Sequence, residues 1–202
     1  YDTGVYLLFG DAGAATAIEF AESASAASYV LGTDGSGYQH LIVPGGGARN
    51  RRDETTGVRK RDADGVLRAA DELYMNGVEV FNFTMTEVPP LIEAILGYHS
   101  WSHEDVDCFA FHQANKFLLQ QVARKSGIDP AKFPINLDKY GNTSSASIPL
   151  VLNDVLKSRK SGERLNVVMA GFGVGFSWGA AALNMENTIC SELVYVKETQ
   201  HV

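Results

Sequence analysis

Near its C-terminal end the sequence reads Gly171-Phe172-Gly173-Val174-Gly175-Phe176-Ser177-Trp178-Gly179, between two short apolar stretches. Those stretches, residues 165–170 and 177–184, have the length and composition of β-strands, so we predict partner strands joined by this segment. Its four glycines, at spacings of two, two and four residues, are more than a tight hairpin needs. They indicate a loop whose backbone passes very close to a ligand or to another loop. No helix follows, so the segment is not a dinucleotide-binding fingerprint.

Strand and helix patterns alternate along the rest of the chain. Short apolar runs predict strands at residues 5–9, 14–20, 38–43 and 106–111, and helical periodicity predicts helices at 62–76, 81–96, 116–126 and 144–157. Pro89 and Pro90 interrupt the second helix, so a kink or two shorter helices are expected there. The charged, aperiodic residues 48–60 are expected to form a loop. Alternation of this kind predicts a layered α/β domain.

Length and composition limit the possible functions. With 202 residues, 45% hydrophobic and 20% charged, the chain suits one domain or one half of a two-part enzyme. No apolar run is long enough to span a membrane, and the first residues lack the features of a signal peptide, so we expect the start to be a cut. The net charge of −7 argues against nucleic-acid binding.

Neither the local basic clusters nor the cysteines indicate a specific kind of site. The clusters at residues 49–52 and 157–160 are either a solvated loop and a helix end or a docking patch. Cys108 and Cys190 have neither the spacing of metal ligands nor that of a disulfide framework. We therefore expect no metal site, and a reducing cytoplasmic location.

The run Phe109-Ala110-Phe111-His112-Gln113-Ala114-Asn115 places His112 at the C-terminal end of a predicted strand, where a helix begins. In layered α/β folds, ligands bind at that edge of the sheet. His112 is therefore a candidate catalytic residue, although a histidine in this position can also be a packed or capping residue. Asn115 is expected to cap the following helix.

A second polar run, Tyr140-Gly141-Asn142-Thr143-Ser144-Ser145-Ala146-Ser147, also precedes a predicted helix. A turn with a helix N-cap explains most of its small polar residues. A Gly-Asn turn that opens a helix also presents an amide side chain and free backbone N–H groups to an anion. The residues alone leave both interpretations open.

In combination, these segments resemble the β-ketoacyl-acyl-carrier-protein synthase III family of the thiolase superfamily. The matching elements, in the family's order and at about its spacing, are Leu8-Phe9-Gly10-Asp11-Ala12-Gly13-Ala14-Ala15, His112-Gln113-Ala114-Asn115, Gly141-Asn142-Thr143-Ser144-Ser145-Ala146-Ser147-Ile148-Pro149 and residues 171–179. The resemblance implies a thiolase-like α/β fold of two similar halves with the active site between them. Residues 1–202 would form the C-terminal half.

The resemblance also implies an activity. Members of the family condense an acyl-CoA starter with malonyl-acyl carrier protein, with decarboxylation, to give the 3-oxoacyl thioester that initiates fatty acid synthesis. His112 and Asn142 would be catalytic, as hydrogen-bond donors to the enolate oxygen. The backbone at Gly173 and Val174 would hold the acyl carbonyl oxygen.

The nucleophilic cysteine of the family lies upstream of the segment that begins here at Leu8, so it would belong to the missing N-terminal half. Cys108 is expected to be a buried packing residue, and the chain alone is expected to be inactive. The resemblance implies no cofactor, because CoA and carrier-protein thioesters are the substrates. It implies as partners acyl-CoA, malonyl-acyl carrier protein, the N-terminal half and a second copy in a homodimer.

One position departs from the family pattern. Members often carry a basic carrier-docking residue two positions after the Asn of the His-x-x-Asn element, where this chain has Phe117. Lys116 is then the candidate docking residue, or another carrier or CoA replaces the usual donor. Two alternatives follow: a specialised condensing enzyme with a different starter or a CoA-bound extender, and a non-catalytic half that binds or dimerises.

The helix at 144–157, apolar around most of its circumference, is expected to lie between two layers.

Overall fold

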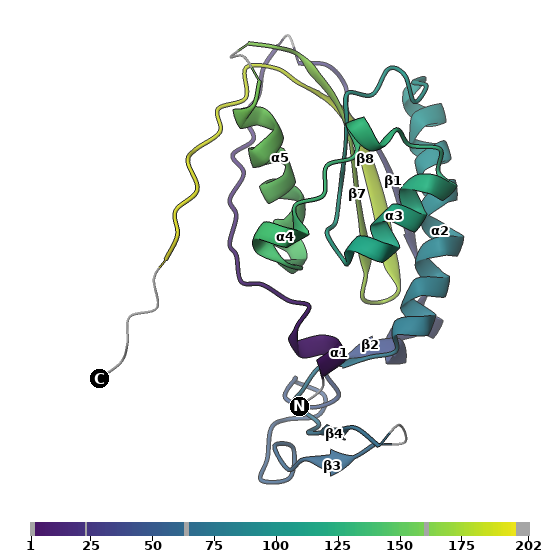
Figure 1. The fold of residues 1–202 in the computed structure, drawn as a ribbon, viewed down its shortest axis with the longest axis vertical. Helices are drawn as coiled ribbons and strands as arrows, with labels where there is room; N and C mark the ends of the chain where they lie inside the picture. Colours follow the sequence, from purple (N-terminus) through teal and green to yellow (C-terminus); the bar gives the residue numbers. More distant parts are fainter. Residues whose placement is uncertain (1–2, 23, 63–64, 160–161, 197–202) are drawn as a thin grey trace.

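The computed structural model describes residues 3–22, 24–62, 65–159 and 162–196. A four-stranded sheet has the order β1-β8-β7-β6, formed by Ser28–Thr33, Ser177–Met185, Leu165–Gly173 and Cys108–Phe111. β6 runs parallel to β7, whereas β7 with β8 and β8 with β1 are antiparallel. Figure 1 shows α2 (Gly77–His99) and α3 (Lys116–Lys125) on one side of the sheet and α5 (Ser147–Lys157) on the other. The predicted layered α/β architecture is confirmed.

Alternate side chains of β6 build two apolar clusters, one on each face of the sheet. Phe109 and Phe111 belong to the cluster that includes α2 and α3, and Cys108 and Ala110 belong to the cluster that includes α5. All four residues are buried, as is typical of a strand that is paired in parallel and covered on both faces. This burial holds the end of β6, where His112 follows, rigidly at the edge of the sheet.

The remaining elements are short. β2 (Leu41–Ile42) pairs with β5 (Tyr74–Met75), and β3 (Lys60–Arg61) pairs with β4 (Leu67–Arg68). The short helices are α1 (Thr3–Tyr6), η1 (Gly35–His40), η2 (Pro130–Lys132), α4 (Leu137–Tyr140) and η3 (Ser144–Ala146). In Figure 1 the β3–β4 pair lies beyond the end of the main sheet, on the side where α1 is found.

The predictions for the second half of the chain are confirmed. Strands predicted at 106–111, 165–170 and 177–184 correspond to β6, β7 and β8, and the helix at 116–126 corresponds to α3. The helix at 144–157 corresponds to η3 followed by α5. Among the described residues, α5 packs against one layer, the sheet at β6, where its buried Val151 joins Cys108 and Ala110 in one apolar cluster.

The helix predicted at 62–76 is wrong. Its described residues form β4, β5 and turns. The N–H of Asp62 donates to the carbonyl oxygen of Val66, and the N–H of Val66 donates to the side-chain carboxylate of Asp62. β5 pairs with a strand far back in the sequence, Tyr74 with Ile42, and β4 pairs with the nearby β3, Arg68 with Lys60. Pairing with earlier residues therefore overrides a local apolar spacing that was compatible with a helix.

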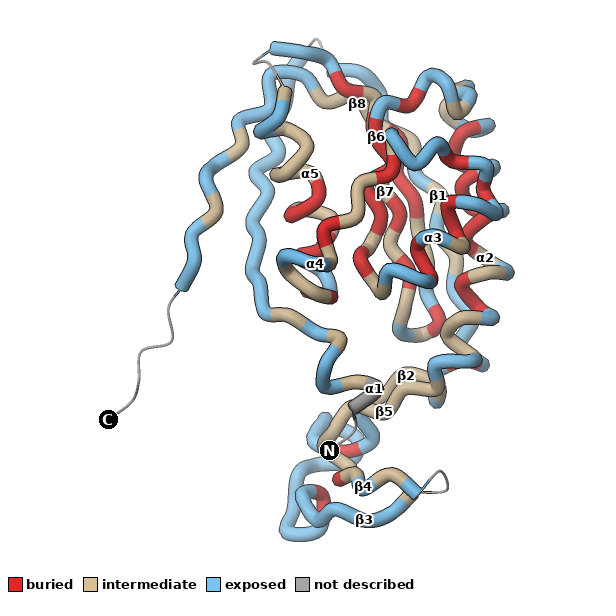
Figure 2. Tube along the Cα trace, in the orientation of Figure 1, coloured by how far each residue is buried: buried red, intermediate tan, exposed pale blue. Residues whose placement is uncertain are grey.

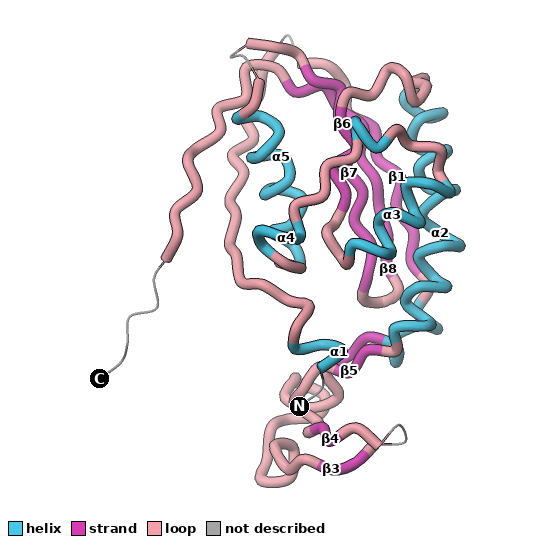
Figure 3. Tube along the Cα trace, in the orientation of Figure 1, coloured by secondary structure: helices cyan, strands magenta, loops and turns pink. Residues whose placement is uncertain are grey.

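The strands predicted at 5–9 and 14–20 are also wrong, and β1 was missed. Residues 3–6 form α1, Phe9 makes an isolated bridge to Asn142, and residues 10–22 and 24–27 form no helix or strand (Figure 3). Most of that segment is exposed (Figure 2). The strand predicted at 38–43 is confirmed only at β2, because η1 occupies the preceding residues. A β-rich sequence does not form a strand without a neighbour to pair with.

Pro89 and Pro90 lie inside one continuous helix, so of the two alternatives expected there, a kink or two shorter helices, the second is wrong. Proline at position 89 has no N–H to donate to the carbonyl oxygen of Met85. That oxygen instead accepts a hydrogen bond of 2.7 Å from Nζ of Lys125. The neighbouring helix α3 therefore supplies the donor that the proline removes.

Candidate active site

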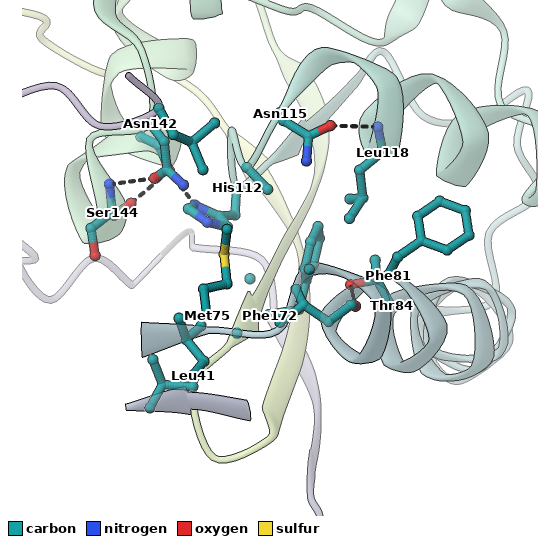
Figure 4. A pocket seen from close by; sticks show the side chains of 18 of the residues that line it. Leu41, Met75, Phe81, Thr84, His112, Asn115, Leu118, Asn142, Ser144 and Phe172 are labelled. Atoms are coloured by element: carbon teal, nitrogen blue, oxygen red, sulfur yellow. Dashed lines mark hydrogen bonds between the residues drawn. The ribbon is translucent and has the colours of Figure 1, made fainter. Parts of the chain in front are cut away.

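A cavity of about 920 Å³ lies where the end of β6, the β7–β8 loop, the start of α2 and the Asn142 segment meet (Figure 4). Four of the residues predicted from the sequence line it together: His112, Asn142, Gly173 and Val174. Lys116 does not line the cavity, although its neighbours Asn115 and Phe117 do. The structure therefore unites the predicted site, except for the candidate docking residue, which is exposed at the start of α3.

His112 is held at the edge of the sheet by its backbone and by its ring. Its N–H donates to the carbonyl oxygen of Ala170 in β7 at 2.8 Å, which continues the β6–β7 pairing by one residue. Its Nδ1 lies 2.8 Å from the hydroxyl oxygen of Ser147, and its ring meets Phe172 edge-on at 5.7 Å. Burial lowers the pKa of His112 below its ordinary value, opposed by a hydrogen bond to the Ser144 backbone. The imidazole is therefore neutral at pH 7.

Asn142 is buried and its carboxamide is oriented by one hydrogen bond. Its Oδ1 accepts from the backbone N–H of Ser144 at 2.9 Å (Figure 4). With Oδ1 occupied in this way, Nδ2 is the end of the amide that can donate to a ligand in the cavity. The residue thus has the orientation that an oxyanion donor requires.

The backbone of Asn142 is fixed by the N-terminal segment. Its N–H donates to the carbonyl oxygen of Leu8 at 3.0 Å, and its own carbonyl accepts from the N–H of Gly10 at 2.9 Å. A Cβ on Gly10 would collide with the carbonyl oxygen of Tyr140, so only glycine fits there. The family resemblance includes this Leu8-Phe9-Gly10 segment but implies no role for it.

A buried amide supports the loop between α3 and Asn142. Gln113 is fully buried, donates to the carbonyl oxygen of Phe111 at 3.0 Å and accepts from the N–H of Asn136 at 3.1 Å. Asn136 in turn donates to Asp154 of α5 at 3.1 Å, and Tyr140 donates to the same carboxylate at 3.2 Å. These bonds hold the loop, and therefore Asn142, against α5.

The glycine-rich loop closes one side of the cavity. Gly175 has φ +138°, a conformation that residues with side chains rarely adopt. The following residue, Phe176, is buried and stacks on Phe83 of α2 with ring centroids 4.2 Å apart. The loop is anchored by this stack, which places the backbone of Gly173 and Val174 at the cavity.

Most of the apolar lining could not be found from the sequence. Leu73 and Met75 come from the region that was wrongly predicted to be a helix, whereas Leu41 comes from β2 and Phe81 from the first turns of α2. Phe117 stacks on Phe81 at 5.9 Å yet remains 62% exposed. These residues have ordinary apolar identities, and only their convergence from distant segments makes them a lining.

Neither cysteine lines the cavity. Cys108 is buried in the cluster beneath α5, as expected, and burial raises the pKa of its thiol to about 11. Such a thiol is protonated at neutral pH and is a poor nucleophile. Within the described ranges, no group of three His, Cys, Asp or Glu side chains could hold a metal ion, and no helix is long and apolar enough to cross a membrane.

Comparison with known proteins now identifies the relatives. Residues 96–185 match the family described as 3-oxoacyl-[acyl-carrier-protein (ACP)] synthase III C terminal. The β-ketoacyl-[acyl-carrier-protein] synthase III of Desulfitobacterium hafniense strain Y51 is 37% identical over 188 residues, 90% of this chain and 53% of the relative. The enzyme of the same name from Symbiobacterium thermophilum is 36% identical over 183 residues, again 90% of this chain and 53% of the relative. The chain is therefore similar, over 90% of its length, to proteins named β-ketoacyl-[acyl-carrier-protein] synthase III.

Solved structures of 3-oxoacyl-(acyl-carrier-protein) synthases show the same fold. A 3-oxoacyl-(acyl-carrier-protein) synthase from Burkholderia xenovorans matches with a TM-score of 0.71 and 40% identity, over 80% of this chain and 44% of that structure. The synthase III from Thermus thermophilus matches with a TM-score of 0.70 and 29% identity, over 93% of this chain and 55% of that structure. The fold is therefore thiolase-like, and the chain spans about half the length of the synthase III relatives it matches.

Proposed function

We propose that this chain supplies the decarboxylation side of a condensing active site. The complete enzyme would join an acyl-CoA starter to malonyl-acyl carrier protein, lose carbon dioxide and yield a 3-oxoacyl thioester for fatty acid synthesis. The observation that carries this proposal is the convergence of His112, Asn142 and the Gly173–Val174 loop on one cavity. Both substrates are thioesters, and the chemistry needs no resident cofactor.

The two polar side chains suit the charge that develops during decarboxylation. When the carbon–carbon bond to the malonyl carboxylate breaks, its electron pair passes into an enolate, and negative charge builds on the thioester oxygen. Fixed hydrogen-bond donors beside that oxygen stabilise the transition state. The oriented Nδ2 of Asn142 would be one such donor, and Nε2 of His112 would be the other in the state in which it carries a proton.

The acylation side needs a thiol that neither Cys108 nor Cys190 provides at the cavity. We propose that it comes from a partner region equivalent to the N-terminal half of the relatives. The backbone at Gly173 and Val174, held in place by the Phe176 stack, would then face the acyl carbonyl oxygen. A second copy of the complete enzyme would complete a homodimer.

The test is decarboxylation by a protein that joins this chain to an N-terminal half of the family. His112→Ala and Asn142→Ala should each slow decarboxylation of a radiolabelled malonyl thioester by about 10²–10³, while the upstream cysteine is still acylated by acyl-CoA. The chain alone should form no product. Loss of acyl transfer with decarboxylation intact would contradict the assignment, and wild-type rates in both variants would favour a non-catalytic binding half.

A CoA-bound extender is the second candidate. It is favoured by the exposed Phe117 at the edge of the cavity, where a carrier-docking cation is expected and where Lys116 lies outside the lining. Running the same assay with malonyl-CoA and with malonyl-acyl carrier protein discriminates the two. A carrier-dependent enzyme should use the carrier-bound extender more efficiently, and Lys116→Ala should weaken that preference alone.

A further inference from the structure

Ser147 is the first residue of α5 and is almost fully buried, with 1% of its surface exposed. Its hydroxyl oxygen lies 2.8 Å from Nδ1 of His112 and 2.7 Å from the carbonyl oxygen of Ser144. The histidine and the serine are 35 residues apart in the sequence, so the packing of α5 against β6 creates this contact. The hydroxyl is therefore shared between a fixed backbone acceptor and the ring of the candidate catalytic histidine.

A serine hydroxyl has one proton to donate and lone pairs with which to accept. The Ser144 carbonyl oxygen can only accept, whereas Nδ1 of His112 donates or accepts according to the tautomer of the ring. All three atoms are satisfied together only if Ser147 donates to Ser144 and accepts from an Nδ1–H group. If the hydroxyl turned to donate to Nδ1, the Ser144 carbonyl would lose this donor.

We infer that Ser147 is a positioning residue that selects the tautomer of His112, so that the resting ring carries its proton on Nδ1. The other ring nitrogen, Nε2, then has a free lone pair. Because Nδ1 is occupied by Ser147 and His112 lines the cavity, Nε2 is the nitrogen left to act on a ligand.

For the proposed condensing function, on which this reading of the chemistry rests, the resting tautomer makes Nε2 a base. It can speed acylation of the upstream cysteine, which still proceeds without it, by taking the thiol proton: the S–H bond breaks, an Nε2–H bond forms and the thiolate keeps the electron pair. Ser147 continues to accept from Nδ1–H and so supports the resulting imidazolium. For a neutral His112 to donate to an enolate instead, the proton must lie on Nε2 and the Ser147 hydroxyl must rotate towards Nδ1.

Nitrogen-15 NMR of the imidazole rings in this chain at pH 7.5 reads the tautomer directly. The chain has five histidines, and the His112 signals are those lost in His112→Gln. The wild type should show a protonated Nδ1 and an unprotonated Nε2. Ser147→Ala should move the ring towards the Nε2–H form, and Ser147→Thr, which keeps a hydroxyl, should restore the wild-type pattern. An Nε2–H ring in the wild type, or an unchanged ring in Ser147→Ala, would overturn the inference.

Ser158→Ala is the matched control. Ser158 follows the other end of α5, and its hydroxyl also donates to the carbonyl oxygen three residues earlier, that of Val155, at 2.7 Å. The control therefore removes the same kind of bond without touching His112, and the tautomer should not change. If Ser147→Ala does not fold, Ser147→Gly replaces it, and the wild-type spectrum remains decisive by itself. The readout needs no substrate, so its failure is distinguishable from failure of the condensing activity.

Discussion

At the scale of single residues, the environment of His112 makes a prediction about pH. Burial holds the folded-state pKa of His112 below the value of about 6.5 that the unfolded chain has. The unfolded state therefore binds a proton more readily, and the free energy of unfolding should fall as the pH drops through 6.5. In urea titrations at pH 7.5 and pH 5, His112→Gln should lose less stability than the wild type. An NMR titration midpoint for His112 at or above 6.5 would contradict this prediction.

At the scale of elements, α2 depends on α3 for a hydrogen bond that its own prolines remove. Lys125→Met should lower the free energy of unfolding by about 1 kcal/mol, because the Met85 carbonyl loses its donor. Chemical denaturation measures the loss, and Lys116→Met, at an exposed lysine of the same helix, is the control and should change little. In a Pro89→Ala background the backbone N–H returns, so the Lys125 substitution should cost less in a double-mutant cycle. Equal costs in both backgrounds would show that the bond does not compensate for proline.

At the scale of the whole molecule, large apolar side chains lie on uncovered surface. Tyr29 and Leu31 of β1 are 64% and 82% exposed, and Ile18 of the extended N-terminal segment is 94% exposed. β1 is an edge strand of the described sheet, and an apolar edge favours association with another chain. We expect light scattering to show self-association and a hydrophobic dye to bind.

Leu31→Lys should reduce both signals, because a charge on an edge strand opposes pairing. Val58→Lys, at an exposed apolar residue away from the main sheet, should not. A monomer at high concentration that binds no dye would show that this surface is not adhesive.

The sequence by itself determined the elements whose signals are local. The strands around the glycine-rich loop and the helices of the second half have continuous apolar patterns, so their types could be predicted, and with them the positions of His112 and Asn142 at element ends. The family motifs then placed both residues in one site. The structure agrees, because these segments meet across β6, β7 and α5.

Tertiary structure alone decided the features that depend on distant partners. β2 and β5 are two residues long and exist through their pairing with each other, so the apolar spacing of residues 62–76, which predicts a helix, does not reveal β5. The bond from Lys125 to Met85 joins residues 40 positions apart, and the bond from Ser147 to His112 joins residues 35 positions apart. A local sequence pattern cannot predict such contacts, because the free energy that forms them comes from packing one element against another.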